Sequence, residues 1–183
     1  MSCVFLSIAG LASNAYEGHS FWDCETWMYP GLLMLHPDIG RSLLEYRVAR
    51  LDEARAKAKS YDAGYEGAMF PWESGATGVE VCPTSAATGQ LEQHVSGDIV
   101  FAAAQYFLAT GDEDWLASDG LALVSGVADF YASRVEVDEN LTAHINDVIP
   151  PDEYAEGDFV SRGFDLDLDL TLLRVCDSFS PHR

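Results

Sequence analysis

The stretch from Asp38 to Lys59, DIGRSLLEYRVARLDEARAKAK, carries the clearest helical pattern in the chain. Asp38 is a suitable N-cap, and the apolar residues that follow recur at spacings of three and four. These residues are Ile39, Leu43, Leu44, Tyr46, Val48 and Leu51. The charged run from Asp52 is typical of a solvent-facing surface, on which Glu53 and Lys57 stand in the favourable order for an ion pair. The stretch therefore predicts an α-helix.

Similar patterns on both sides of this stretch extend the helical prediction to most of the chain. Further helices are predicted up to Leu35, from about Glu92 to Thr110, around Asp112 to Ala117, and from about Leu121 to Arg134. Pro30 interrupts the first of them, and Gly111 is a stop signal for the second. No segment shows the regular alternation and hairpin turns of a β-sandwich. The sequence thus indicates an all-α protein.

Composition limits the classes of partner. The 183 residues contain 30 acidic and 10 basic side chains, which gives a net charge of -20. Without a basic surface to neutralise phosphate, we expect neither nucleic acid nor an anionic membrane as partner. The charge suits neutral polar ligands, and the oligomeric state is left open.

The N-terminal segment gives no clear targeting signal. The segment Cys3 to Leu11 is apolar, but it lacks a basic n-region and is too short to span a bilayer, so we do not interpret it as a signal peptide. The compartment is left open, with the cytoplasm slightly favoured.

The four cysteines are widely spaced, at Cys3, Cys24, Cys82 and Cys176. They show no paired spacing, so free thiols are favoured over a zinc site, and no metal or cofactor is predicted.

The segment GHSFWDCETW, from Gly18 to Trp27, has a composition that neither helix nor strand periodicity explains. It combines aromatic rings with two carboxylates. Sugar-binding sites use such mixtures, because pyranose rings stack on apolar platforms and carboxylates accept hydrogen bonds from hydroxyl groups. The alternative is a helix start rich in aromatic residues, with Asp23 as its N-cap.

A second unusual segment is GAMFPWES, from Gly67 to Ser74. Its Phe, Pro, Trp and Glu residues predict a loop that exposes Trp72 and Glu73. The following residues, 75–89, are rich in Thr, Ser and Gly and predict a long irregular loop, which is often functional.

Two further features carry candidate chemistry. His94 and Asp98 lie one helical turn apart, which fits a metal pair, ligand hydrogen bonding or helix-end capping. Pro150 and Pro151 stiffen the loop that carries Asp152 and Glu153. A neighbouring carboxylate or an apolar wall raises the pKa of a carboxyl group toward that of a general acid, although such a loop is also compatible with a simple turn.

Taken in order, these segments resemble the catalytic domain of glycoside hydrolase family 65. The resemblance is carried by GHSFWDCETWMYP (18–30), GYEGAMFPWES (64–74), GVEVCP (78–83), EQHVSGDI (92–99) and PDEY (151–154). The segments RSLLEYRVARLDEARAKA (41–58) and QYFLATGDEDWL (105–116) are also similar to the family. That family includes disaccharide phosphorylases, acid trehalases and the glucosidase that acts on glucosylgalactosylhydroxylysine of collagen. The VEVCP loop favours the last two branches.

The resemblance implies an (α/α)6 barrel and inversion at the anomeric carbon of an α-glucoside. Glu153 matches the general acid. Phe21, Trp22 and Asp23 match part of the glucose subsite, and Trp72 and Glu73 match further sugar contacts.

The resemblance also implies what lies outside this sequence. Inversion needs a second carboxylate, about 6.5 to 9.5 Å from the acid. In the family that base lies far beyond the acid, so we expect this chain to lack it. We expect residues 1–154 to form the first half of the catalytic domain, and residues 155–183 to be a divergent tail, non-native or disordered, with strand-like alternation from Asp165 to Leu170.

We therefore expect a glycoside hydrolase of carbohydrate metabolism that cleaves a small-molecule or glycan α-glucoside. A phosphorylase of an α-glucosyl disaccharide and a non-catalytic sugar-binding fragment are the alternatives.

Overall fold

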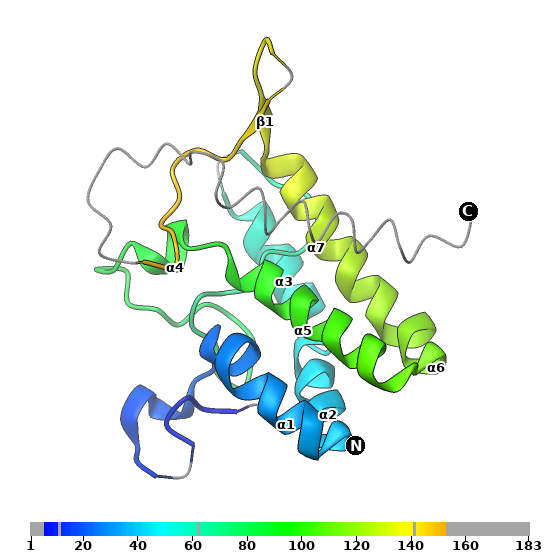
Figure 1. Ribbon diagram of the computed structural model, residues 1–183. Coiled ribbons are helices and arrows are strands. Elements are labelled where there is room, and N and C mark those ends of the chain that lie inside the picture. The colour runs from blue at the N-terminus through cyan, green and yellow to red at the C-terminus, as the bar shows by residue number, and fades with distance from the viewer. Residues whose placement is uncertain (1–5, 11, 62, 141, 153–183) are drawn as a thin grey trace.

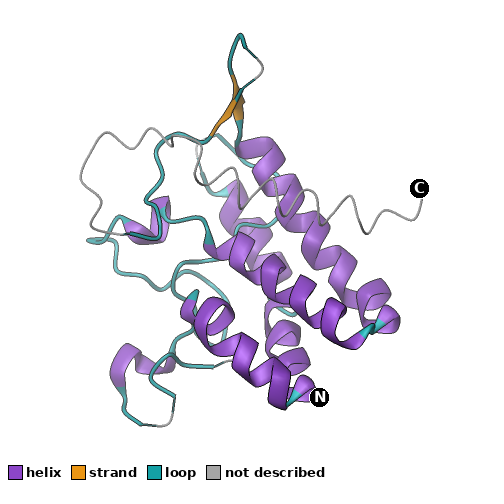
Figure 2. Ribbon diagram, in the orientation of Figure 1, coloured by secondary structure: helices purple, strands orange, loops and turns teal. Residues whose placement is uncertain are grey.

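The computed structural model describes residues 6–10, 12–61, 63–140 and 142–152, and these form a mostly helical protein (Figures 1 and 2). The helices and helical turns are η1 (Ala15–Gly18), η2 (Cys24–Met28), α1 (Tyr29–Leu35), α2 (Pro37–Val48), α3 (Leu51–Lys59), α4 (Thr88–Leu91), α5 (Val95–Thr110), α6 (Glu113–Trp115), η3 (Leu116–Gly120) and α7 (Leu121–Arg134). The predicted helical class is confirmed. A short hairpin was not predicted, because its strands β1 (Glu136–Val137) and β2 (Ala143–His144) have only two residues each.

The helix ends follow local chemistry. Gly111 ends α5 in the left-handed conformation, with φ 65°, and the side chain of Asp112 accepts a hydrogen bond from the backbone N–H of Trp115 at the start of α6. The predicted stop at Gly111 is confirmed. Asp38 is not the N-cap of α2, however, because Pro37 starts the helix and His36 takes the cap position.

The charged stretch after α2 differs from the prediction in two ways. Ala49 and Arg50 separate α2 from α3, and the guanidinium of Arg50 donates two hydrogen bonds to the carbonyl of Ala76. Lys57 does not face solvent or pair with Glu53. Its side chain is 10% exposed and forms an ion pair with Glu80, 23 residues later in the sequence.

Helix α5 lies at the centre of the packing (Figure 1). It contacts α1 and α2 on one side and α7 on the other. Fully buried side chains such as Ile99, Leu123 and Phe130 fill the space between these helices. The connections that contain residues 19–28, 70–94 and 145–152 gather at the end of the array where α5 begins (Figure 1). The helix array thus places irregular segments from three parts of the chain together.

The structure describes two of the four cysteines. Cys24 and Cys82 are free thiols, as predicted, whereas Cys3 and Cys176 lie outside the described part of the chain. Among the residues that the structure describes, no helix has both the length and the apolar character needed to cross a membrane.

Candidate sugar-binding site

Backbone hydrogen bonds join two of the unusual segments. The N–H of Ser20 donates to the carbonyl of Ser74 at 2.8 Å, and the N–H of Ser74 donates back to the carbonyl of Ser20 at 3.1 Å. Ser74 also pairs with Glu80 in an antiparallel bridge. The segments that precede Trp22 and follow Trp72 therefore lie side by side, although about 50 residues separate them.

A buried ion pair fixes both segments to α2. Arg47 donates to both oxygens of Glu25, from Nε at 2.7 Å and from Nη2 at 3.0 Å, and Nη1 donates to Oγ of Ser74 at 3.3 Å. The Arg47 and Glu25 side chains are only 2% and 8% exposed. Burial alone lowers the pKa of Arg47, but the Glu25 carboxylate outweighs burial and raises it. The bidentate contact therefore holds the η2 turn and the loop after Trp72 at one place.

His94, the residue just before α5, is the centre of an aromatic cluster. Its ring lies edge-on to Trp22, with 4.8 Å between ring centroids, and to Trp72, with 5.9 Å. Phe21 packs edge-on against Trp72 at 6.0 Å. Phe21, Trp22 and Trp72, the three aromatic residues predicted for the sugar site, thus form one group with the histidine of the EQHVSGDI motif (92–99).

Two carboxylates hold the imidazole of His94. Nδ1 contacts Oδ2 of Asp98 at 2.7 Å, and Nε2 contacts Oε1 of Glu92 at 2.9 Å. Burial lowers the pKa of His94, but the two hydrogen-bonded carboxylates more than offset it and raise the pKa to about 9. His94 is therefore an imidazolium at neutral pH, and both of its ring nitrogens donate.

The two predicted sugar-binding carboxylates differ in their surroundings. Asp23 is half-buried, accepts no helix-capping hydrogen bond, and has no hydrogen bond or ion pair to another residue in the described part of the chain. Asp23 occupies the predicted N-cap position of η2, although its side chain does not make the capping hydrogen bond. Glu73 contacts Nδ1 of His19 at 2.8 Å, and its side chain is 16% exposed. His19 thus orients one carboxylate, while the other is available to a ligand.

Trp72 lies in a loop, as predicted, but its predicted exposure is wrong. It is 7% exposed, as is Phe21, because the two rings pack against each other and Trp72 also packs against His94. Trp22 is half-buried, and its ring contacts the exposed Trp27 as well as His94. Of the predicted aromatic contacts, Trp22 is therefore the most accessible.

The proline loop is attached beside this cluster. The N–H of Ile149 donates to the carbonyl of Leu91 at 3.0 Å, one residue before Glu92. Arg134 donates from Nη2 to the carbonyl of Asn146 and from Nε to Gln93. These contacts hold Asn146 and Ile149 close to the segment that precedes α5, and the exposed Asp152 follows shortly after them in the chain. The predicted acid Glu153 lies outside the described residues.

Within the described ranges, no group of three or more His, Cys, Asp or Glu residues has an arrangement that could hold a metal ion. Both ring nitrogens of His94 contact carboxylates of the protein itself, an arrangement that differs from the predicted hydrogen bonding to a ligand.

Comparison with known proteins places these residues in a family. The sequence matches the model of the glycosyl hydrolase family 65 central catalytic domain over residues 5–162. The chain belongs to glycosyl hydrolase family 65. The chain spans about a fifth of the length of the curated relatives it matches, which are longer proteins.

Two curated family 65 relatives illustrate the similarity. The chain is 55% identical over 155 residues to a protein-glucosylgalactosylhydroxylysine glucosidase of Dictyostelium discoideum, covering 83% of this chain and 22% of the relative. It is 50% identical over 147 residues to a kojibiose hydrolase of Flavobacterium johnsoniae, covering 80% of this chain and 21% of the relative.

A solved structure shows the same fold. It belongs to a protein assigned as a kojibiose phosphorylase from the human microbiome, with a TM-score of 0.86 and 23% sequence identity. The match covers 95% of this chain and 25% of the other. The arrangement of helices described above is therefore also found in a segment of this larger solved structure.

Sequence reasoning missed three residues of this family 65 site: His19, Glu25 and Arg47. Arg47 carried a usable signal, because it lies three residues after Leu44 and four before Leu51, on the apolar face of the predicted helix. A charged residue on such a face indicates a buried partner. No comparable pattern marks His19, whose contact with Glu73 spans 54 residues.

Proposed function

We propose that this chain supplies the glucose subsite of a family 65 enzyme that hydrolyses an α-glucoside with inversion. The observation that carries the proposal is the Asp23 carboxylate. Asp23 directly follows Trp22, whose ring packs against His94, and it is half-buried with no hydrogen-bond or ion-pair partner among the described residues. A half-buried carboxylate beside apolar rings is suited to accept hydrogen bonds from sugar hydroxyls.

In this proposal, some of the remaining site residues contact the sugar and others support those contacts. Trp22 offers the apolar surface for the C–H face of the glucose ring, and Glu73, oriented by His19, accepts further hydroxyl hydrogen bonds. Phe21 and Trp72 are nearly buried, so they form the wall that supports Trp22 and offer only a narrow edge to the sugar.

Glu153 is the proposed general acid. Its assignment rests on the PDEY motif, and the attachment of Ile149 beside Glu92 supports a position of this loop near the cluster. Inversion also requires a base that activates water. We assign none among the described residues, and we propose that the longer form of the protein supplies it, as the family resemblance implies.

The same proposal covers the architecture. We propose that the helices are part of an (α/α)6 barrel, with residues 1–154 in its first half and 155–183 as a separate tail. Large apolar side chains that are exposed on the described helices support a larger assembly that covers them, namely Trp27, Met34, Leu35 and Leu108.

Glucose binding by this chain, measured by titration calorimetry, tests the subsite. Asp23→Ala should weaken binding about tenfold or more, because a hydrogen-bonded charge is lost. Asp129→Ala removes an exposed aspartate from α7 and is the matched control. Equal affinity in both variants would contradict the role of Asp23.

The reaction is tested separately on the longer form of the protein, with kojibiose and a glucosylgalactosylhydroxylysine peptide, the compounds that occur in the names of the two relatives. An inverting hydrolase releases β-glucose first, which proton NMR detects, and Glu153→Gln should abolish release. Turnover that requires inorganic phosphate would favour the alternative of a phosphorylase, which a relative from Halothermothrix orenii represents. Glucose binding that Glu153→Gln leaves intact, with no turnover of either compound, would favour the sugar-binding alternative.

A further inference from the structure

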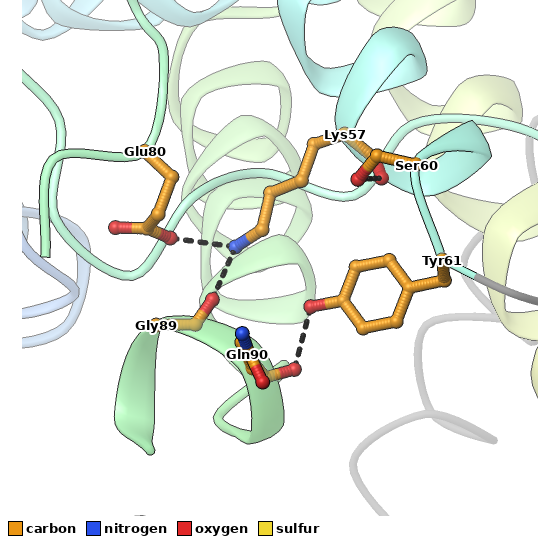
Figure 3. Close-up of a pocket in the computed structure, with 6 residues that line it drawn as sticks. All are labelled: Lys57, Ser60, Tyr61, Glu80, Gly89 and Gln90. Atoms are coloured by element: carbon orange, nitrogen blue, oxygen red, sulfur yellow. Dashed lines mark hydrogen bonds and ion pairs between the residues drawn. The ribbon is translucent and has the colours of Figure 1, made fainter. Parts of the chain in front are cut away.

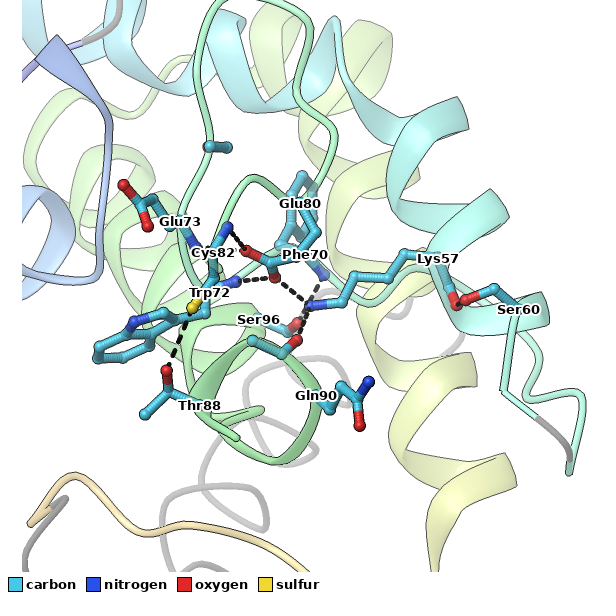
Figure 4. A network of polar contacts seen from close by, with 12 residues as sticks. Lys57, Ser60, Phe70, Trp72, Glu73, Glu80, Cys82, Thr88, Gln90 and Ser96 are labelled. Carbon is cyan, nitrogen blue, oxygen red and sulfur yellow. Dashed lines mark hydrogen bonds and ion pairs between the residues drawn. The ribbon is translucent and has the colours of Figure 1, made fainter. Parts of the chain in front are cut away.

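The carboxylate of Glu80 lies between the side chain of Lys57 and the loop that carries Trp72 and Glu73 (Figure 4). Its Oε2 accepts a hydrogen bond from the backbone N–H of Trp72 at 2.8 Å. Its Oε1 accepts from the backbone N–H of Glu73 at 3.0 Å and from that of Cys82 at 3.1 Å. One side chain thus binds three backbone amides of the same loop.

A lysine connects this carboxylate to two helices. Nζ of Lys57 donates to Oε2 of Glu80 at 2.6 Å and to the carbonyl of Gly89 at 2.9 Å (Figure 3). Lys57 belongs to α3 and Gly89 to α4. These side chains border a surface cavity of about 370 Å³. Because the polar atoms of Lys57 and Glu80 bind each other there, we interpret the contact as a support and not as a ligand site.

The loop is also held by the site itself. The Trp72 ring packs against Phe21 and His94, and the Glu73 side chain contacts His19. The carbonyl of Glu73 also accepts from the N–H of Val81 at 3.0 Å, which joins the loop to the strand-like segment of Glu80. Backbone and side chains of residues 72 and 73 are therefore fixed by different partners.

We infer that Glu80 is a positioning residue for the sugar site, because its carboxylate fixes the backbone amides from which Trp72 and Glu73 project. The role of the site rests on the proposed function, but the contacts of Glu80 do not. An acidic side chain is needed here because only a carboxylate can accept all four of these hydrogen bonds. Burial lowers the pKa of Lys57, and Glu80 opposes that change.

Glu80→Gln tests the inference with little change of shape. One carboxylate oxygen becomes an NH₂ group, so either the donors Trp72 N–H and Lys57 Nζ or the donors Glu73 N–H and Cys82 N–H face another donor. We expect amide hydrogen exchange measured by NMR on the full chain to accelerate about tenfold or more at one of these pairs. Glucose affinity should fall by a similar factor, while exchange in α7 stays at the wild-type rate.

Two further variants complete the test. Asp52→Asn removes an exposed carboxylate that pairs with Arg55 on α3, and it should change neither exchange nor affinity. Lys57→Met leaves the three amide bonds of Glu80 intact, so exchange at Trp72 and Glu73 should stay near the wild-type rate. The inference is overturned if Lys57→Met accelerates this exchange tenfold. It is also overturned if Glu80→Gln folds but leaves the exchange at Trp72, Glu73 and Cys82 unchanged. Lys57→Met still gives an answer if Glu80→Gln fails to fold.

The two proposals fail in different ways. A wild-type chain that gives no heat with glucose, but whose loop amides are released by Glu80→Gln, would overturn the proposed function and support the positioning role. Normal glucose binding by Glu80→Gln would overturn the positioning role and leave the proposed function standing.

Discussion

Raising the pH from 6 to 9 should destabilise this protein through His94. The pKa of His94 is raised in the folded protein to about 9, from an ordinary value of 6.5, because Asp98 and Glu92 offset its burial. A raised pKa means that the folded state binds the proton more tightly, so the stabilisation is complete below pH 6.5 and is lost as the pH rises through 9.

The size of this effect follows from the two pKa values. At pH 6 the protonated His94 contributes about 3 kcal/mol to the free energy of unfolding, at pH 7.5 about 2 kcal/mol, and at pH 9 less than about 1 kcal/mol. These values apply to a side chain that is 9% exposed, for which screening by solvent is weak.

Urea unfolding followed by circular dichroism at 222 nm measures this contribution at the three pH values. His94→Gln cannot be protonated, so the difference in stability between wild type and variant should shrink by about 2 kcal/mol or more between pH 6 and pH 9. His36→Gln, at an exposed histidine just before α2, is the control substitution. A wild-type minus His94→Gln difference that does not vary with pH would refute the charged state of His94.

Two backbone and packing predictions can be tested by thermal unfolding. Gly67→Ala should lower stability by more than about 3 kcal/mol, because a Cβ at φ +66° would lie 2.2 Å from the carbonyl oxygen of Gly126. Gly111→Ala is the control: its φ is +65°, but a Cβ there would meet no atom within 4 Å, so it should lower stability by only about 1 kcal/mol. Equal losses in the two variants would contradict the clash at Gly67. Arg47→Met should lower stability by about 3 to 5 kcal/mol, because it leaves the buried Glu25 carboxylate without its cation, and adding Glu25→Gln should recover part of the loss. A double variant less stable than Arg47→Met alone would contradict this reasoning.

The sequence was sufficient where local rules decide the structure. Helix α7 spans Leu121–Arg134 as predicted, and α5 ends at the predicted glycine, because apolar periodicity and a left-handed cap are properties of neighbouring residues. The start of α2 was misplaced by two residues, because Pro37 suits the first helical position and moves the cap from Asp38 to His36.

The arrangement of the candidate site depends on contacts that no local pattern contains. The motifs were recognisable, but the packing of Trp72 against His94, which buries it, links two motifs 22 residues apart. The ion pair of Lys57 with Glu80 likewise replaced the local pair with Glu53, because burial strengthens an interaction that an exposed helix surface leaves weak. Long-range electrostatics of this kind is decided by the fold and not by spacing.

The π-helical turn Cys24–Met28 has a consequence for how this site can change. Such a turn contains one residue more than an α-helical turn. Deletion of a single codon here would convert the turn to an ordinary α-helical turn, and because both kinds of turn advance the chain by about one revolution, Trp22 would keep nearly the same direction relative to α1. The same deletion inside α1 would instead rotate everything before it by roughly 100° about the helix axis. The π-helical turn is therefore the place where this segment can change its length by one residue while the Trp22 ring stays beside His94.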